Sequence, residues 1–445
     1  MYFRRYGFIL VMFTFLCLIF TGCSNQTNTD SKENETNAND QTDETSNEPT
    51  EQNTDEDPEE KVKITIAYQW GEDAFNKRYR PIEEYLGNVE IEFVASTNTL
   101  QGFEEMFAAG IKPDIIVDQN IFALQDLDVI YPLDDLLEQS GFDVGIFDQP
   151  LLDSLRAYDD EGRTIGLPDG TSVIGLYYNK DVFDLFGIDY PDPEKPMTWQ
   201  EVLDLARKMT VERDGVQYIG LDGMSRFALQ QFAPTATNPE TGEVLINERE
   251  AYKRYFDLVA EFYNIPGMRE EESLGTNFVE KRAAMTLATN VALNWIGGDD
   301  VESLDLVPFP VWPDQPTIGP LMGTTPMVIT NYSENKEVAL EILKAYFLPE
   351  ILTEHVRTGG TVPPIADEEL LKQYAVDLEI YNGKNLAAYY VLDRVTREEP
   401  VSRWDDFVDL ASAETAIKEG KDVVTVLREL EEESTAKIQE AMAGK

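Results

Sequence analysis

The chain has 445 residues, of which 84 are Asp or Glu and 36 are Lys or Arg, so its formal net charge at pH 7 is −48. Nucleic acids and anionic lipid surfaces bind basic protein surfaces, and this charge argues against both as partners. The single histidine, His355, rules out a metal site of clustered histidines and leaves one candidate base for a serine-based triad. Its neighbours, "LTEHVRTGG", are typical of a helix end, where a histidine is more often a cap. Catalytic carboxylate pairs stay possible, because Asp and Glu are abundant throughout.

The first residues have the pattern of a secretory signal. Arg4 and Arg5 precede the apolar run "GFILVMFTFLCLIF", which is too short for a stable membrane-spanning helix and ends at "TGCSN". "TGC" resembles the lipobox of bacterial lipoproteins, although Phe20 stands where that family usually has Leu. The resemblance implies removal of residues 1–22 and acylation of Cys23 as the new N-terminus. The alternative is an ordinary signal peptide with an incidental cysteine.

Cysteine usage and composition agree with a lipid anchor followed by a tether. Cys17 lies in the segment to be removed, so the mature chain keeps only Cys23 and can form no intramolecular disulfide. Several acyl chains on one cysteine provide the multi-chain anchoring that stable membrane attachment needs. The polar, acidic composition of the next residues is typical of disorder. We therefore expect residues 23–60 to be a lipidated cysteine and a disordered acidic tether, with an acidic interaction tail as the alternative.

The chain from Lys61 onward is long enough for two domains, and it begins with alternating strands and helices. Such an alternation is typical of an α/β domain with a parallel sheet, whose ligands meet the loops at the carboxyl ends of the strands. Three such loops follow the expected strands, at 69–71, 96–98 and 118–120. The expected strands are 61–70, 89–96 and 112–118, and the expected helices are 80–87, with Pro81 in its first turn, and 99–110.

The glycine-rich stretch "GRTIGLPDGTSVIGLYYNKDVF", residues 162–183, has no catalytic spacing. It matches neither phosphate-binding pattern, and it lacks the Gly-x-Ser-x-Gly of a nucleophile elbow. What remains is a turn followed by a β-run.

Further elements follow this stretch. We expect a helix at 199–209 with Thr198 and Glu201 as a capping box, an edge strand or loop in the Pro-rich 307–316, and a mostly helical segment from Ala366 onward. A helix end and strand are expected in 282–295, a strand at 326–330 and a helix at 335–348.

The stretch "GLPDGTSVIGLYYNKDVFDLFGI", followed by "PMTWQEVLDLARKMT", is similar to type 1 extracellular solute-binding proteins. These are receptor components of ATP-driven importers and are related to maltose-binding protein. "PDIIVD", "VEKRAAMTL", "NKEVALEILKAYFL" and "GGTVPP" occur in the order of that family. The resemblance covers essentially the whole chain from Lys61 to the C-terminus.

The resemblance implies an α/β, two-lobed periplasmic-binding-protein fold (type II), in which the chain makes three hinge crossings between the lobes. The crossings match Gly170–Ile174, "IGPLMGTTP" and "GGTVPPI". Closure of the lobes around a ligand is the signal that a permease would detect. The implied lobes are 61–170 plus 325–358 and 171–324 plus 359–445, the second including the C-terminal helices.

The ligand contacts of the family carry over to individual positions. Relatives often have a tryptophan near Val291, whereas this chain has Trp295 a few residues later, which puts that platform in doubt. Buried tryptophans are more often core than platform, and Asp118 could instead cap the next helix. The implied contacts are Gln69, Trp70, Asp118, Thr171, Ser172, Arg226, Trp295 and Trp404.

The sequence therefore predicts a lipid-anchored binding protein, and not an enzyme, at the extracellular face of the cell membrane. It would bind an oligosaccharide or other carbohydrate as a monomer, with no cofactor and no metal, and pass it to the permease subunits of an ABC importer. Flat aromatic faces beside planar polar groups suit sugars without proving them. The alternatives are a non-sugar solute or a lipid-anchored polysaccharide hydrolase or lyase.

Overall fold

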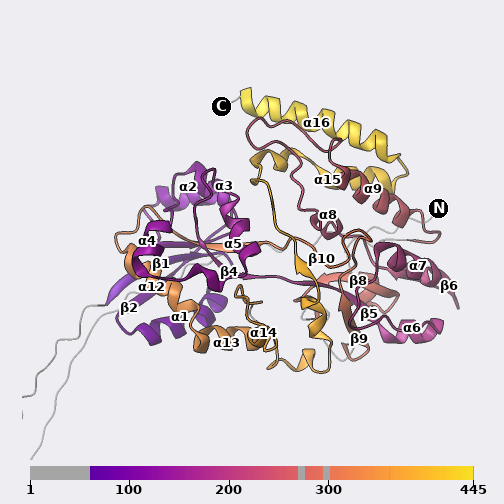
Figure 1. The fold of residues 1–445 in the computed structure, drawn as a ribbon, viewed down its shortest axis with the longest axis horizontal. Helices are drawn as coiled ribbons and strands as arrows, with labels where there is room; N and C mark the ends of the chain where they lie inside the picture. The colour runs from indigo at the N-terminus through magenta and orange to yellow at the C-terminus, as the bar shows by residue number, and fades with distance from the viewer. Residues whose placement is uncertain (1–60, 269–275, 294–300, 360, 444–445) are drawn as a thin grey trace, which may run out of the picture. The chain divides into compact units, whose positions relative to one another are not determined.

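The computed structural model describes residues 61–268, 276–293, 301–359 and 361–443 (Figure 1). These residues form two five-stranded sheets, each flanked by helices, and a separate pair of short strands. The arrangement is the α/β fold with two lobes that the sequence predicts. The predicted signal peptide, Cys23 and the tether lie outside the described residues, and so does Trp295.

The first sheet has the strand order β2-β1-β3-β11-β4. Strands β1 (Val62–Tyr68), β2 (Val89–Ala95) and β3 (Ile115–Val117) are parallel, as expected for strands joined by helices. Strand β11 (Thr324–Ile329) comes from much later in the chain and lies antiparallel between β3 and β4 (Leu167–Thr171). Residues that alternate along β1 pack into different core clusters, so both faces of the sheet are buried.

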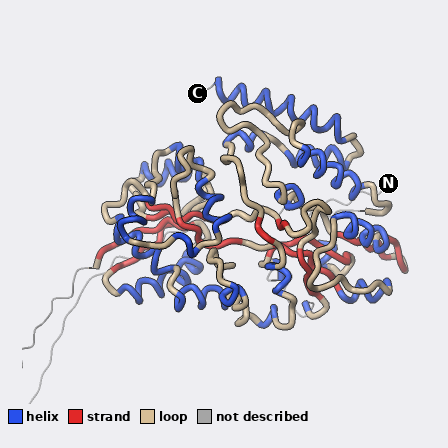
Figure 2. Tube along the Cα trace, in the orientation of Figure 1, coloured by secondary structure: helices blue, strands red, loops and turns tan. Residues whose placement is uncertain are grey.

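Helices cover both faces of this sheet (Figure 2). One core cluster joins the strands to apolar residues of α1 and α12, and another joins them to those of α2 and α3. The helices of this lobe are α1 (Glu72–Leu86), α2 (Leu100–Ala108), α3 (Ile121–Asp126), α4 (Asp134–Ser140), the short η1 (Val144–Ile146), α5 (Gln149–Arg156), α12 (Lys336–Tyr346) and α13 (Pro349–Arg357).

The second sheet has the order β6-β7-β8-β5-β9. Its strands are β5 (Ile174–Asn179), β6 (Val211–Arg213), β7 (Val216–Leu221), β8 (Ala283–Thr289) and β9 (Leu304–Pro308). Strand β9, at the start of the Pro-rich segment, lies at an edge, where a missing backbone donor is tolerated. The helices around it are α6 (Lys180–Phe186), α7 (Trp199–Met209), α8 (Phe227–Gln230), α9 (Glu250–Tyr263), α10 (Thr276–Val279), α15 (Leu410–Lys418) and α16 (Val423–Ala443).

The chain passes between the two sheets three times, and these crossings touch one another at Thr171. The first crossing leads from β4 to β5, and the second leads from β10 (Ile318–Gly319) to β11. The Thr171 amide donates a hydrogen bond to the Val362 carbonyl in the third crossing (3.0 Å), and its hydroxyl donates to the Gly323 carbonyl in the second (3.1 Å). Thr171 therefore ties all three segments together.

Local signals in the sequence place several helix ends correctly. Thr198 and Glu201 form the complete capping box at the start of α7. The Thr99 side chain caps α2 by accepting a hydrogen bond from the Gly102 amide. Both helices start where short-range hydrogen bonding dictates, because the cap depends only on residues within one turn.

One expectation about a helix was wrong. Helix α1 begins at Glu72, so Pro81 lies inside it and not in its first turn. The Pro81 ring leaves one carbonyl without a helical donor, but the buried stripe of Phe75, Tyr79 and Ile82 holds the helix together through tertiary packing.

The segment after residue 366 is mostly helical, as expected, although its first half has only short helical turns. Between α13 and α15 it forms short turns joined by irregular chain, because it follows the surfaces of both lobes. Its elements are α14 (Glu368–Leu371), η3 (Glu379–Tyr381), η4 (Leu386–Tyr390), β12 (Asp393–Arg394) and η5 (Arg403–Phe407).

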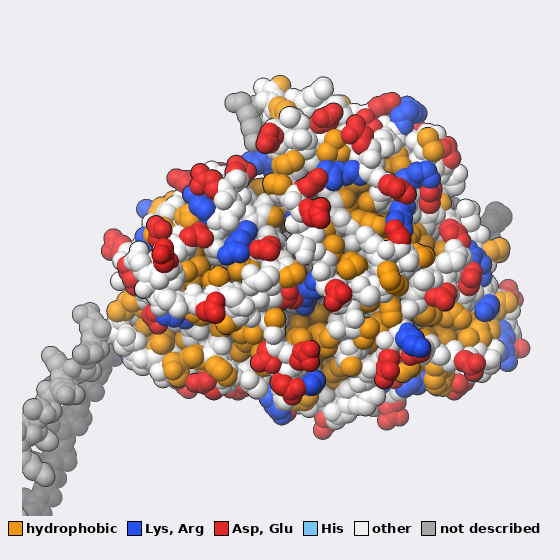
Figure 3. Space-filling model, viewed as in Figure 1, with side chains coloured by type: hydrophobic (Ala, Val, Ile, Leu, Met, Phe, Trp, Pro, Cys, Tyr) orange, Lys and Arg blue, Asp and Glu red, His pale blue; other side chains and the backbone are white. Residues whose placement is uncertain are grey.

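Charge is dispersed over the surface. Figure 3 shows Asp and Glu side chains scattered among Lys and Arg over the visible face. Within the ranges given above, no helix combines the length and apolar character that crossing a bilayer requires.

His355 lies in the last turn of α13, at the helix end that the sequence predicts, but its ring is buried. It is 6% exposed, its ring lies 5.6 Å from that of Tyr346, and its Nε2 has no partner among the described atoms. Burial and the nearby Arg78 guanidinium lower the pKa of His355 to about 4. Its imidazole is therefore neutral in the folded protein at neutral pH.

This environment predicts a pH dependence of stability. The unfolded chain binds a proton at His355 near its ordinary pKa of 6.5, while the folded chain does so only near 4. The free energy of unfolding should therefore fall as the pH drops from 6.5 to 4, by about 1.4 kcal/mol for each unit of pKa difference. Urea unfolding of the wild type and of His355→Leu at several pH values measures this. Parallel pH profiles for the two proteins would show that His355 contributes nothing.

Candidate functional site: the edge of the first sheet and the crossings

The register of the first sheet brings four chain segments to one edge. Tyr68 of β1 pairs with Val117 of β3, and Val117 pairs with Met327 of β11. Across the next strand pair, Thr324 of β11 lies beside Thr171 of β4. The residues that follow β1, β3 and β4 and precede β11 therefore lie side by side, facing the crossings. Loops at the carboxyl ends of strands are where such sheets place ligands.

Trp70 offers an aromatic face at this edge. Its side chain is 44% exposed, and the edge of one ring meets the Tyr68 ring, with centroids 5.1 Å apart. The exposed face of the indole is flat and apolar, so it can pack against a ligand. Gln69 precedes it, and the Gln69 Nε2 is buried without a partner within the described part of the chain. An amide that lacks a hydrogen bond here suits a ligand acceptor.

Trp70 also lines a groove of about 810 Å³ between α1 and α13. His355 and Arg78 lie in the same groove, so the Trp70 ring stands at the junction of the sheet edge and this helix face.

Asp118 has a supporting role in its loop. It is fully buried and accepts hydrogen bonds from the Ser96 hydroxyl (2.7 Å) and the Asn120 amide (3.0 Å). Burial raises the pKa of its carboxyl, and these hydrogen bonds oppose the rise. Asn120, and not Asp118, caps α3, so Asp118 joins the loops that follow β2 and β3. The neighbouring Gln119 donates to the Thr325 hydroxyl at 3.3 Å.

Thr171 and Ser172 differ in what they expose. Thr171 is 8% exposed and its hydroxyl already donates to backbone carbonyls. Ser172 is exposed, and its hydroxyl makes no hydrogen bond within the described ranges. Ser172 therefore is the residue of the first crossing that can bind a ligand through its side chain.

The two second-lobe residues of the predicted set lie in other surroundings. Arg226 precedes α8 and forms a two-point ion pair with Glu414 of α15, at 2.6 and 3.1 Å, and Glu414 also accepts from the Tyr255 hydroxyl. Trp404 packs on Phe407 with ring centroids 6.0 Å apart, and a Cβ at Gly242 would lie 3.4 Å from its Cγ. Gln69, Trp70 and Asp118 thus follow neighbouring strands of the first sheet, and Ser172 follows β4 at the other side of that sheet edge. Arg226 and Trp404 pack against α15 and the C-terminal part of the chain.

Sequence reasoning missed the ion pairs that join the lobes. The Arg394 Nε donates to the Asp148 carboxylate at 2.5 Å, and Arg403 pairs with Asp126 at 2.8 Å and lies over the Phe122 ring. The partners are 246 and 277 positions apart in the chain, and no short motif marks either pair.

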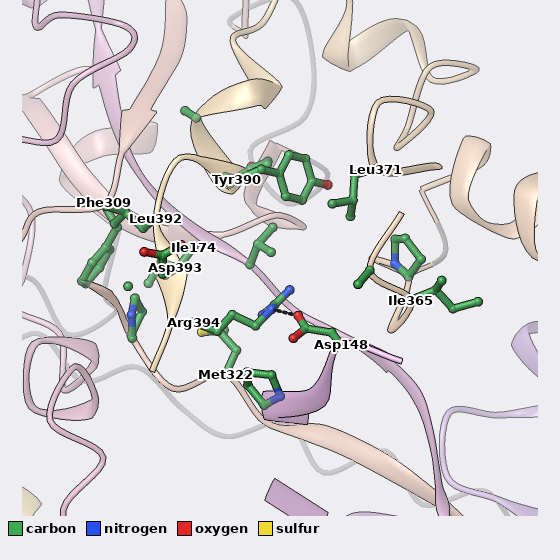
Figure 4. A pocket seen from close by; sticks show the side chains of 18 residues that line it. Asp148, Ile174, Phe309, Met322, Ile365, Leu371, Tyr390, Leu392, Asp393 and Arg394 are labelled. Carbon is green, nitrogen blue, oxygen red and sulfur yellow. Dashed lines mark hydrogen bonds and ion pairs between the residues drawn. The ribbon is translucent and has the colours of Figure 1, made fainter. Parts of the chain in front are cut away.

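The Arg394–Asp148 pair lies in a cavity of about 380 Å³ (Figure 4). Its walls come from both lobes and from all three crossings. None of the predicted contact residues that the structure describes lines it. Figure 4 shows Tyr390 and Leu371 on one side of the ion pair, and Ile174, Leu392 and Phe309 on another.

Within the described ranges, no group of three His, Cys, Asp or Glu side chains is placed to hold a metal ion.

Comparison with known proteins identifies the class. The sequence profile of the bacterial extracellular solute-binding protein family matches residues 65–351, which is more than half of the chain. The chain belongs to this family, whose matched members and structural neighbours are binding proteins.

Among curated proteins, the chain is similar to a putative binding protein of Brucella abortus (strain 2308), with 24% identity over 266 residues. That match covers 57% of this chain and 62% of the relative, so the chain spans less than two thirds of it. It also resembles the sn-glycerol-3-phosphate-binding periplasmic protein UgpB of Escherichia coli (strain K12), with 28% identity over 141 residues, 31% of this chain and 30% of UgpB.

Solved structures show the same fold. An ABC substrate-binding protein of Listeria monocytogenes in complex with cycloalternan superposes with a TM-score of 0.65 and 16% identity, over 85% of this chain and 100% of that one. The sugar-binding protein MalE of Xanthomonas citri gives a TM-score of 0.67 and 16% identity, over 86% and 100%. UgpB of Mycobacterium tuberculosis in complex with glycerophosphocholine gives 0.64 and 15%, over 85% and 99%.

Proposed function

We propose that the protein is the substrate-binding component of an ABC importer, which captures an oligosaccharide or another carbohydrate between its lobes and delivers it to the membrane permease. The observation that carries the proposal is the exposed indole of Trp70 beside polar groups at the edge of the first sheet. In this reading the lobes are 61–170 plus 325–358 and 171–324 plus 359–445.

The chemistry of the site suits a sugar. The flat C–H faces of a pyranose ring pack on an aromatic face, while its hydroxyl groups need planar polar partners. Trp70 supplies the face, and the buried Gln69 amide and the exposed Ser172 hydroxyl supply hydrogen-bonding groups. Arg226 approaches from the second lobe when the lobes close, and Trp295 and Trp404 complete the proposed contacts.

The proposal also includes the attachment of the protein to the membrane. Cys23 would carry the lipid anchor, and residues 24–60 would tether a monomeric, cofactor-free binding protein to the extracellular face of the membrane. The three crossings support a hinge, because they lie side by side and are hydrogen-bonded to one another at Thr171.

A non-sugar solute is the second candidate, since two proteins similar to this one are named for glycerol phosphodiester or phosphate ligands. A panel of maltotriose, mannotriose and glycerophosphocholine separates the candidates by calorimetry. Binding of either sugar and not of glycerophosphocholine supports the first proposal, and the reverse pattern supports the second.

Trp70→Ala should weaken binding of the preferred ligand about tenfold to a hundredfold, because an aromatic platform contributes roughly 1–3 kcal/mol. Trp70→Phe should recover part of the loss. Tyr85→Ala is the matched control, since Tyr85 is an exposed aromatic residue at the other end of α1, 55% exposed. Equal affinities for Trp70→Ala and the wild type in titration calorimetry would remove Trp70 from the site.

A further inference from the structure

The cavity of Figure 4, which we call the hinge cavity, has walls from every segment that connects the lobes. Val173 and Ile174 come from the first crossing, Gly319, Pro320 and Met322 from the second, and Pro363, Ile365 and Ala366 from the third. The remaining walls come from the start of α5, from Phe309, from Leu371 and from residues 388–390 and 392–394. At about 380 Å³ the space has the size of a small-ligand site.

The hinge cavity has hydrogen-bond donors that the protein does not use. The Tyr390 hydroxyl is buried and has no partner among the described atoms. Figure 4 shows it directed toward Leu371, across the space from Arg394. Arg394 donates its Nε–H to Asp148, and its side chain is 18% exposed, so its Nη groups can reach solvent or a ligand. A buried donor without an acceptor, such as the Tyr390 hydroxyl, is rare in folded proteins, and it marks a place where a ligand or water supplies the acceptor.

The charges and the apolar wall of the hinge cavity limit which kinds of ligand can bind there. Asp148 already neutralises the positive charge of Arg394, so no net positive charge remains to attract an anion. The Asp393 carboxylate at the rim would also repel an anion. An added cation could not accept hydrogen bonds from either donor. The rest of the wall is apolar and includes Pro363, Ile365 and Leu371. The site thus suits an uncharged oxygen acceptor on an apolar ring.

We propose that the hinge cavity is a second binding site, separate from the proposed carbohydrate site, for a small uncharged molecule with an apolar ring and one carbonyl oxygen. The carbonyl accepts hydrogen bonds from Tyr390 and Arg394, and the ring packs on the apolar wall. Because the crossings form this wall, the shape of the cavity depends on the angle between the lobes. A ligand that fits one angle better shifts the population toward it, and this effect on solute binding rests on the proposed function.

Benzamide is a suitable probe, because it is neutral, soluble and combines an aromatic ring with a carbonyl. Titration of the full mature chain, followed by NMR or calorimetry, should show saturable binding of benzamide. Benzoate and benzylammonium, which keep the ring and add a charge, should bind at least about tenfold more weakly. Equal binding of all three, or no binding of benzamide, overturns the proposal.

Two variants test whether benzamide binds in the hinge cavity. Tyr390→Phe removes the hydroxyl alone and should weaken benzamide about fivefold. Ala366→Phe fills the cavity from an exposed wall position and should abolish binding. Ala411→Phe is its matched control, on an exposed position of α15 away from the cavity. Unchanged affinity in Ala366→Phe would show that benzamide binds elsewhere.

The benzamide titrations use no carbohydrate, so their outcome is independent of the proposed function. A parallel sugar titration then separates the two proposals. Benzamide binding without any sugar binding would leave the hinge cavity in place and reject the carbohydrate proposal. Sugar binding that benzamide does not alter, despite occupancy of the cavity, would reject the coupling between the two sites.

Discussion

Arg78→Met should lower the free energy of unfolding by about 3–5 kcal/mol, because it leaves a buried carboxylate without its cation. Arg78 of α1 pairs with Asp169 of β4, and their side chains are only 13% and 5% exposed. The Tyr346 hydroxyl donates to the Asp169 carbonyl at 2.8 Å, and the Arg78 guanidinium lies over the Tyr68 ring. The pair thus links α1, the first strand and the strand that leads into the first crossing.

The double variant Arg78→Met/Asp169→Asn should recover part of this loss, since it removes both charges together. Lys63→Met is the matched control, because the Lys63–Glu92 pair is exposed, 57% and 41%, and should contribute at most about 1 kcal/mol. Urea unfolding of the four proteins measures these differences. A loss below about 1 kcal/mol in Arg78→Met would falsify the account of the pair as a buried link.

Gly220→Ala should destabilise the second lobe by about 3 kcal/mol, through a clash with backbone. Gly220 lies in β7, and a Cβ there would overlap the Cα, carbonyl carbon and oxygen of Ala206 in α7. Side chains can rotate away from such an overlap, but a helix backbone can only shift as a whole. The close contact of α7 with β7 therefore depends on glycine at this position.

Gly323→Ala is the matched control for Gly220→Ala. A Cβ at Gly323 would meet no atom within 4 Å, and the residue has no positive φ. This substitution should leave stability unchanged or raise it by about 0.4–1 kcal/mol, since alanine restricts the unfolded chain. Thermal unfolding of both variants provides the comparison. Similar losses in the two proteins would mean that the Gly220 contact is not the cause.

Much of the fold follows from short-range patterns in the sequence. The Thr198 capping box and the buried strands of the first lobe each depend on residues close together in the chain. The turn expected just before Thr171 was wrong, because Leu167–Thr171 forms strand β4, which pairs with the distant strand β11. Short-range patterns do not predict the start of α1. Pro81 is a plausible first-turn residue by local rules, and tertiary packing of Phe75 and Tyr79 overrides that preference.

The candidate site was predictable only where it lies at strand ends. Gln69, Trp70 and Asp118 follow β1 and β3, so the alternation of strands and helices is enough to place them. The roles of the predicted residues depend on tertiary contacts. Asp118 accepts a hydrogen bond from Ser96, and Arg226 forms an ion pair with Glu414. No pattern in the sequence predicts the hinge cavity, because its walls come from distant segments that only the complete fold brings together.

The central claim is that the two lobes close around a solute. Small-angle X-ray scattering of the protein, with and without the sugar that binds in calorimetry, tests it most directly. Closure of the lobes predicts a smaller radius of gyration at saturating sugar, and a smaller decrease when the same concentration is added to Trp70→Ala, which binds the sugar more weakly. Saturable binding of the sugar with an unchanged radius of gyration in the wild type would contradict closure of the lobes.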